Sequence, residues 1–301
     1  MGKTIKIIIL AVIAAVLAVA MIWGIVAGNS YIALQGKHAE RQGAAQNAVQ
    51  TQFEAEMQGV QNIRLDLVCE GIDVVVTNES KIRIEEHSNR QMDEEDMIRC
   101  SVNGGTVAVE SGLKNEWFSG FSWAKYGDIQ VTLYVPSAYK NSLDLYSVSG
   151  RVDVQDAQAS RARLETISGS INARNSRFSS LDLKSVSGGI VAVGCNADDA
   201  TANNVSGAIL VNESAFKELS GKTISGAYDV DLNDMPGDIN ISSVSGALTL
   251  KLPENSGFSL QTNSVSGGVY NDFAIAHGVY KEGGSRVTLE TVSGGISVIK
   301  K

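Results

Sequence analysis

The side chains of Asp229-x-Asp231-x-Asn233 have the spacing with which a calcium-binding EF-hand loop begins. Their oxygen atoms are of the kind that Ca²⁺ prefers as ligands. The rest of the motif is missing, because position six carries Asp234 in place of glycine and position twelve carries Asn240 in place of glutamate. The segment therefore fits the outward face of a strand better than a metal site.

Other chemical motifs are also incomplete. Gly221-Lys222-Thr223 resembles the end of a phosphate-binding P-loop, but Phe216 stands where the motif needs its first glycine. The chain has no H-E-x-x-H sequence, no G-x-S-x-G sequence, and only three isolated histidines: His38, His87 and His277. We therefore expect no catalytic residues, no metal and no cofactor, and we do not expect an enzyme.

Aromatic side chains gather in one short segment. Two of the three tryptophans lie there with three other rings: Trp117, Phe118, Phe121, Trp123 and Tyr126. The glycines and serines around them are typical of a loop. If exposed, the rings would form a contact for a glycan, a peptide or a lipid headgroup, because they give a large contact area at small entropic cost. If buried, they would form a lid over the fold.

Eight copies of one motif fill the C-terminal half of the chain. Each copy is a Ser, Thr or Asn, then Val or Ile, then Ser-Gly, and the glycines recur at intervals of 19 to 21 residues before a last interval of 27: Gly150, Gly169, Gly188, Gly207, Gly226, Gly246, Gly267 and Gly294. A fixed period of this size is the signature of a solenoid.

The first copy shows the unit: Leu143-x-Leu145-x-x-Val148-x-Gly150-x-Val152-x-Val154. Alternation of apolar residues with period two predicts strands, and the step of three predicts a corner. A further apolar residue follows late in each coil: Ala159, Phe178, Ala197, Phe216 and Met235. One coil cannot bury its own apolar face, so the sequence predicts an all-β parallel β-helix of roughly 19–21-residue coils stacked on each other.

The corner residues have predicted orientations. We expect the glycine to point inward beside the Val or Ile, where a side chain would meet the opposite wall or the backbone needs a positive φ. The serine before it would point outward, from Ser149 to Ser293. The preceding polar residue would bond to local backbone. The outward serines would either be solvated or bind a ligand.

Residues 60–142 predict irregular N-terminal coils ahead of the regular coils of residues 143–301. Leu65-x-Leu67, Gly71 to Val74, Ile82-x-Ile84, Val102 to Val109 and Ile129 to Val135 read as strands.

The three cysteines are an odd number without a C-x-x-C motif and indicate no disulfide framework and no zinc site. Cys69 and Cys100 lie on candidate neighbouring coils, where they would form a disulfide or pack as small core residues. Cys195 lies within the regular coils.

The N-terminus predicts a membrane anchor. Residues 1–6 form a tail with Lys3 and Lys6, and residues 7–27 carry no charge over a length that matches a bilayer core. The positive-inside rule puts the tail in the cytoplasm and the C-terminal domain outside, as a single-pass protein of the cell membrane. A cleaved signal peptide is the alternative, because Ala18-Val19-Ala20 resembles a cleavage site. Residues 28–59, with Phe53 and Met57 on one loosely spaced apolar side, suggest a helical stalk or linker.

The part of the chain after Lys6 has 23 basic and 33 acidic residues, a balance of −10. Nucleic acid and anionic membrane surfaces are therefore poor partners.

The Ser-Val-Ser-Gly-x-Ile-x-Val units, the strand that ends in Val135-Pro136 and the N-terminal anchor resemble the bacterial putative-adhesin family with β-strand repeats. That family is a domain-of-unknown-function family related to the head domain of putative autotransporter adhesins. The resemblance covers about residues 60–301. It implies a β-helical fold and a cell-envelope location, and it carries no catalytic residues. The segment from Trp117 to Tyr126 lies outside the repeat motif.

We therefore expect a membrane-anchored extracytoplasmic β-solenoid that acts as a binding or adhesion module at the bacterial cell envelope. Its ligand would be a glycan, cell-wall material or a protein. The alternative is an accessory protein of a cell-envelope stress response or another membrane regulatory system, which would act through its helix and stalk.

Overall fold

A computed structural model describes residues 48–113 and 128–301. They contain 23 strands and one 3₁₀ helix, η1 (Glu94–Asp96), and belong to a compact unit that begins at Ala44. The predicted membrane helix of residues 7–27 lies outside the described residues. Within them, no helix has the length and apolar character needed to cross a bilayer.

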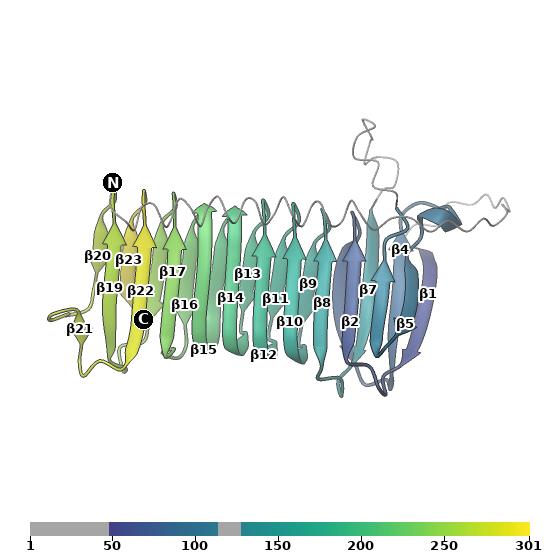
Figure 1. The fold of residues 1–301 in the computed structure, drawn as a ribbon, viewed down its shortest axis with the longest axis horizontal. Helices are drawn as coiled ribbons and strands as arrows, with labels where there is room; N and C mark the ends of the chain where they lie inside the picture. The colour runs from purple at the N-terminus through teal and green to yellow at the C-terminus, as the bar shows by residue number, and fades with distance from the viewer. Residues whose placement is uncertain (1–47, 114–127) are drawn as a thin grey trace. The chain divides into compact units, whose positions relative to one another are not determined.

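The strands form two facing rows, and β15 bends from one row into the other (Figure 1). The first row runs, in order of pairing, β1 (Ala48–Glu56), β4 (Lys81–Ser88), β7 (Ile129–Pro136), β3 (Gly71–Thr77), β9 (Val152–Gln155), β11 (Ile171–Arg174), β13 (Ile190–Val193), β15 (Ile209–Ser225), β16 (Tyr228–Leu232), β18 (Leu248–Leu252), β23 (Ile296–Lys300) and β20 (Val269–Asn271).

The second row runs β5 (Arg99–Asn103), β6 (Thr106–Glu110), β2 (Asn62–Leu67), β8 (Ser142–Ser147), β10 (Gln158–Thr166), β12 (Arg177–Ser185), β14 (Asn196–Ser206), the second half of β15, β17 (Asp238–Ser243), β22 (Ser285–Thr291), β19 (Phe258–Ser264) and β21 (Val279–Tyr280). The strands expected in residues 60–142 are confirmed as β2 to β7.

Most neighbouring strands are parallel, as expected. The register advances by 19 residues per coil in the middle of the rows, where Leu164 pairs with Leu183 and Ile171 with Ile190. A coil here means one strand of the second row, its Ser-Gly corner and the following strand of the first row. Antiparallel pairs occur only near the two ends of the described rows, at β1–β4, β4–β7, β5–β6 and β19–β21.

The coils do not stack in sequence order throughout. Coil β22–β23 lies between β17–β18 and β19–β20, so the last coil of the sequence is internal. At the other end, β2–β3 lies between β6–β7 and β8–β9. Periodicity alone suggests a stack in sequence order, and this is wrong at both ends because each end carries an inserted coil.

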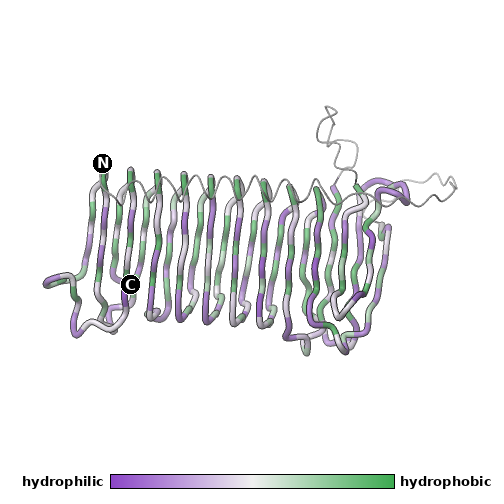
Figure 2. The backbone as a smooth tube through the Cα atoms, in the orientation of Figure 1, coloured by the Kyte–Doolittle hydropathy of each residue, from purple (hydrophilic) through white to green (hydrophobic). Residues whose placement is uncertain are grey.

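Apolar residues alternate with polar ones along each coil (Figure 2). One continuous core of buried apolar side chains fills the space between the rows. The corner differs from the expectation. The motif's Val or Ile is at least partly exposed at most corners, as at Val186 and Val205, while the polar residue before it is buried, as at Thr166 and Ser185. The serine before each glycine is exposed from Ser168 onward, as predicted.

Several of the buried polar residues bond to backbone, as predicted, whereas the hydroxyls of Thr223, Ser243 and Thr291 at later corners have no hydrogen-bond partner among the described residues. The Thr166 hydroxyl accepts a hydrogen bond from the Gly169 amide at 3.0 Å, and the Ser185 hydroxyl does the same for Gly188. The Asn204 amide donates to the Gly188 carbonyl at 2.7 Å. These bonds satisfy polar groups that the corner would otherwise leave unpaired in the interior.

The glycines form a column because of the neighbouring coil and not because of the opposite wall. A Cβ atom on any of the eight would lie within 2.6 Å of a backbone carbonyl oxygen of the adjacent coil, usually that of the next glycine in the column. Real Cβ atoms do not approach other atoms within 3.0 Å. Among the eight glycines of the column, only Gly207 has a positive φ, of 142°. Close axial packing therefore explains the motif.

The last residues of the predicted stalk are extended, so their helical interpretation is wrong. Strand β1 pairs antiparallel with β4, opposite Ile84 and Ile82, and this places Phe53 and Ala55 against the core. Burial of these side chains against an existing sheet outweighs a weak helical preference. Residues 28–47 lie outside the described residues.

Replacement of Gly188 by alanine should lower the free energy of unfolding by about 2–3 kcal/mol, because its Cβ would collide with the Gly169 carbonyl. Gly189→Ala is the matched control, since its Cβ meets nothing closer than the Ala208 oxygen at 3.7 Å. The control should cost less than about 1 kcal/mol. Urea unfolding followed by circular dichroism measures both. Equal losses would contradict the column's explanation.

Candidate functional site

The five aromatic residues predicted as ligand contacts lie in residues 114–127, outside the described residues: Trp117, Phe118, Phe121, Trp123 and Tyr126. The described chain stops at Leu113 and resumes at Asp128, just before β7. These residues stay predictions. Of the predicted site residues, the described part contains only the eight repeat glycines.

A groove crosses five successive coils on one side of the rows and has a volume of about 970 Å³. Its floor is the late apolar position of the repeat: Ala159, Phe178, Ala197, Phe216 and Met235. We call it the side groove. The first four floor residues are 4 to 7% exposed, so the floor is a closed apolar surface that belongs to the core. The sequence pattern identified these positions without showing that they line up under an open channel.

Charged side chains line the rims of the side groove. Lys217 pairs with Asp198 at 2.6 Å across neighbouring coils. Arg177 lies toward one end, whereas Glu218 and Asp234 lie toward the other. Among the described residues, none of these last three side chains makes an ion pair. The groove therefore offers an unpaired cation and unpaired carboxylates to a ligand that spans several coils.

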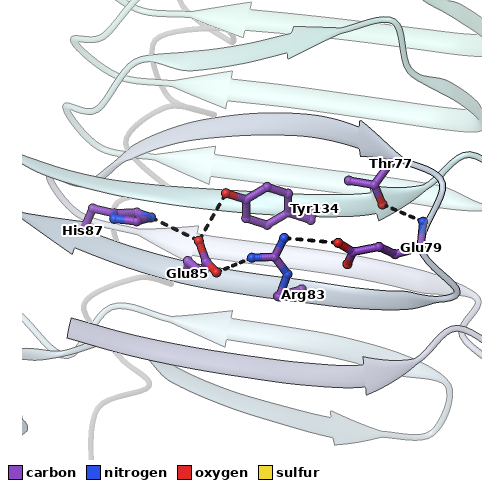
Figure 3. A network of polar contacts seen from close by, with 6 residues as sticks. All are labelled: Thr77, Glu79, Arg83, Glu85, His87 and Tyr134. Carbon is purple, nitrogen blue, oxygen red and sulfur yellow. Dashed lines mark hydrogen bonds and ion pairs between the residues drawn. The ribbon is translucent and has the colours of Figure 1, made fainter. Parts of the chain in front are cut away.

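A second polar cluster lies on the outer face of β4 and β7 (Figure 3). The Arg83 guanidinium lies 3.7 Å from the centre of the Tyr134 ring and pairs with Glu85 and Glu79. The Tyr134 hydroxyl donates to Glu85 at 3.1 Å, and His87 lies 3.3 Å from the same carboxylate. Burial and the Glu85 carboxylate raise the pKa of Tyr134. The cluster ties β4 to β7 because its members satisfy each other.

Glu70 is fully buried at the corner of coil β2–β3, in the position of the glycine column. Its carboxylate accepts hydrogen bonds from the Val68 and Cys69 amides, both at 2.8 Å, and from the Ser111 hydroxyl. In the regular corners those amides bond to the preceding coil, as Ser149 does to Val68. The coil that precedes β2–β3 in the stack is β6–β7, whose two strands are separated in the sequence by the segment with the aromatic residues. The Glu70 carboxylate therefore accepts the hydrogen bonds that backbone carbonyl oxygens of the preceding coil accept at the regular corners.

Glu86 on β4 is the second fully buried carboxyl. One oxygen accepts from the Ile98 amide at 3.1 Å, and the other, Oε1, has no hydrogen-bond partner. Burial, and to a smaller extent the charge of Glu70, raise the pKa of Glu86 to about 7. A proton on Glu86 therefore stabilises this end of the fold near neutral pH. The sequence analysis missed both glutamates, although an acidic residue in the glycine position was a signal for Glu70.

The cysteines are free thiols, so Cys69 and Cys100 form no disulfide in this structure. Burial raises the pKa of each of these two to about 12, and the nearby carboxylates add to the effect. Both thiols are therefore protonated and unreactive at neutral pH. The third, Cys195, is buried within the regular coils.

In the segment that resembles a calcium-binding loop, two of the side-chain oxygens are bound by Lys301. The Lys301 ammonium bonds to Asp231 at 2.5 Å and to Asn233 at 2.9 Å, on the outer face beside β16. A lysine in that place competes with a cation for the same oxygens. Across residues 48–113 and 128–301, no group of three or more His, Cys, Asp and Glu side chains is arranged to hold a metal ion.

The comparisons with known proteins concern the fold. A family model described as Toastrack DUF4097 matches residues 60–299. A solved structure of a putative adhesin from Bacteroides fragilis shares 11% identity, with a TM-score of 0.54 over 83% of this chain and 96% of that one. A putative lipid binding protein from Parabacteroides distasonis shares 13% identity, with a TM-score of 0.51 over the same shares. No curated protein matches the chain.

Stability should fall as the pH rises from about 4.5 to about 7, because the folded state holds the Glu86 proton more tightly than the unfolded chain does. Glu86→Gln keeps the neutral shape and should remove a drop of several °C in melting temperature. Glu85→Gln, at the neighbouring position on the outer face, should weaken the fold but keep the slope. Melting curves at pH 5, 6, 7 and 8 test this. A slope unchanged in Glu86→Gln would refute it.

Proposed function

The chain belongs to the Toastrack DUF4097 family, and we propose that it is a non-catalytic binding module that holds an extended polymer in its side groove. The observation that carries the proposal is a groove that repeats one surface over five coils. Neighbouring parallel strands lie about 4.8 Å apart, so the floor residues span roughly 19 Å. That length matches about six residues of extended peptide or a few sugar units.

The chemistry of the groove suits a polymer better than a small molecule. An apolar floor with polar rims lets a strand lay one face on Phe178 and Phe216 while its polar groups meet both rims. Arg177 and the carboxylates of Glu218 and Asp234 would bind charges of opposite sign at the two ends. Cell-wall strands that carry both amino and carboxyl groups, and segments of a partner protein, have this character.

The similar structures support binding over catalysis. One is described as a putative adhesin and the other as a putative lipid binding protein, and neither description is that of an enzyme. Within the described residues, none of the buried carboxyls and none of the three thiols lines the groove. We therefore propose adhesion or ligand capture at the cell envelope, with the aromatic residues between Trp117 and Tyr126 as a second contact.

We further propose that the β-solenoid is held at the cell membrane. Lys3 and Lys6 precede an uncharged run of bilayer length, which supports a single-pass anchor with the binding domain outside the cytoplasm. A module placed there meets cell-wall polymers and surface proteins directly.

Arg177→Glu should weaken binding of the full-length chain to isolated cell walls by at least about tenfold, because a carboxylate then replaces a groove cation that makes no ion pair among the described residues, and it repels carboxylates of the ligand. Arg161→Glu is the control, since Arg161 is exposed and does not line the groove. Co-sedimentation with purified wall material measures both. Equal binding by the two variants would rule out the groove as the site.

Protease added to intact protoplasts should remove the whole β-domain and leave a small membrane-bound fragment, because the domain lies outside the cytoplasm. Immunoblots against the C-terminus and the N-terminus report the two parts. Protection of the domain until the membrane is lysed would overturn the proposed topology.

A further inference from the structure

Coil β19–β20 forms the C-terminal end of the described rows, because β22–β23 is inserted behind it. Nothing in the described chain pairs with the outer edge of β20. The end of a stack is where its core must be closed against water. Here only one half of the end is closed.

Three aromatic rings close that half. Phe258, Phe273 and Tyr280 pack against each other with ring centres 4.8 to 5.4 Å apart. Strand β21 adds to this closure by pairing antiparallel with β19 at Phe258 and Ser259. Phe273 and Tyr280 belong to residues 272–284, a segment that projects past β20 at the lower left of Figure 1, whereas Phe258 begins β19. We call residues 272–284 the end plug.

The other half of the end, by the Ser-Gly corner, is open. Val269 occupies a core position whose partner in the next coil, Ile296, is fully buried, yet Val269 is 48% exposed. Val265 is 54% exposed and Tyr270 58%. These are three of the seven large apolar side chains that the described residues leave exposed. The core is thus open to solvent at Val269, and beside it lie Val265 at the corner and Tyr270 on the outer side of β20.

This edge also lacks the usual protection against strand addition. Residues 259–271 contain no charged side chain and no proline. Natural edge strands are normally blocked by charges, by proline or by a covering segment. At the other end of the rows, β1 and β4 carry Lys81 beside Glu54 and Glu56. The C-terminal edge of the described rows is therefore open to pairing with a further strand.

We propose that this edge pairs with a second copy of this chain, joined end to end through a two-fold axis perpendicular to the two rows. Such an axis reverses the strand direction and exchanges the two halves of the end. The end plug of each copy then covers Val265, Val269 and Tyr270 of the other, and the β20 edges meet antiparallel.

Two features favour a second copy over an unrelated strand. One half of the end projects and the other half is open. A two-fold contact requires a surface that is complementary to itself, and here the projecting half of each copy can fit the open half of the other. The uncharged edge can also meet its own copy without like-charge repulsion. The contact closes after two chains, so it makes a dimer and no fibre. This inference does not depend on the side groove.

The test is the mass of the full-length chain in a density-matched detergent, by sedimentation velocity over a hundredfold range of concentration. The native chain should be a dimer that dissociates on dilution, and hydrogen exchange of residues 261–271 should speed up as it does. Val269→Lys should be monomeric, because it puts a charge into the contact, and it should melt at the temperature of the diluted, monomeric native chain. Leu210→Lys, at an exposed apolar site in the middle of the rows, should remain a dimer.

A native chain that is monomeric throughout would overturn the proposal. So would a dimer that Val269→Lys leaves intact, since that dimer would be held by another surface, such as the N-terminal segment. Hydrogen exchange in residues 261–271 that does not change with concentration would also overturn it.

Discussion

The close approach of successive corners is the constraint on which the rest of the structure depends. Each glycine of the column lies directly against a carbonyl of the next coil, closer than any side chain allows. This contact lets the corner stack at the same spacing as the strands on both sides, so the pairing of both rows can continue through it. At three corners the buried Thr166, Ser185 and Asn204 side chains then bond to the backbone of these glycines. The spacing of the coils, the register of the strands and the hydrogen bonds at the corners therefore all depend on this contact.

Glu70 shows what happens where this constraint is broken. The coil before it is interrupted, so the amides of Val68 and Cys69 lose their backbone acceptors, and a buried carboxylate takes their place. A charge in the interior is tolerable only with several donors, which the two amides and Ser111 supply. Glu86, nearby, has one oxygen without a partner and holds a proton instead. Among the described residues, the buried carboxyl groups thus lie at the irregular end of the fold.

Much of the fold could be read from the sequence because the repeat is local and copied eight times. The strands, the parallel pairing and the outward serines follow from alternation and period. The corner could not be read correctly, because the step of three hides whether Val186 or Ser185 faces inward, and hydropathy favours the wrong one. The coil order was also hidden, since Gly267 and Gly294 look alike wherever they stack. The groove floor was visible as a pattern, but the unpaired charges on its rims depend on neighbours far apart in sequence.

The exchanged order of the last coils bears on how the chain is made. A stack in sequence order can grow coil by coil as the polypeptide emerges, each new coil docking on a finished one. In this protein β19–β20 emerges before β22–β23 but pairs against it, so the final 17 residues must enter an internal position. The β17–β18 coil keeps an exposed pairing edge until β22 and β23 have been made. Completion of the rows therefore requires β22–β23 to insert between two coils that precede it in the sequence, and removal of β22–β23 would remove a middle layer and not an end.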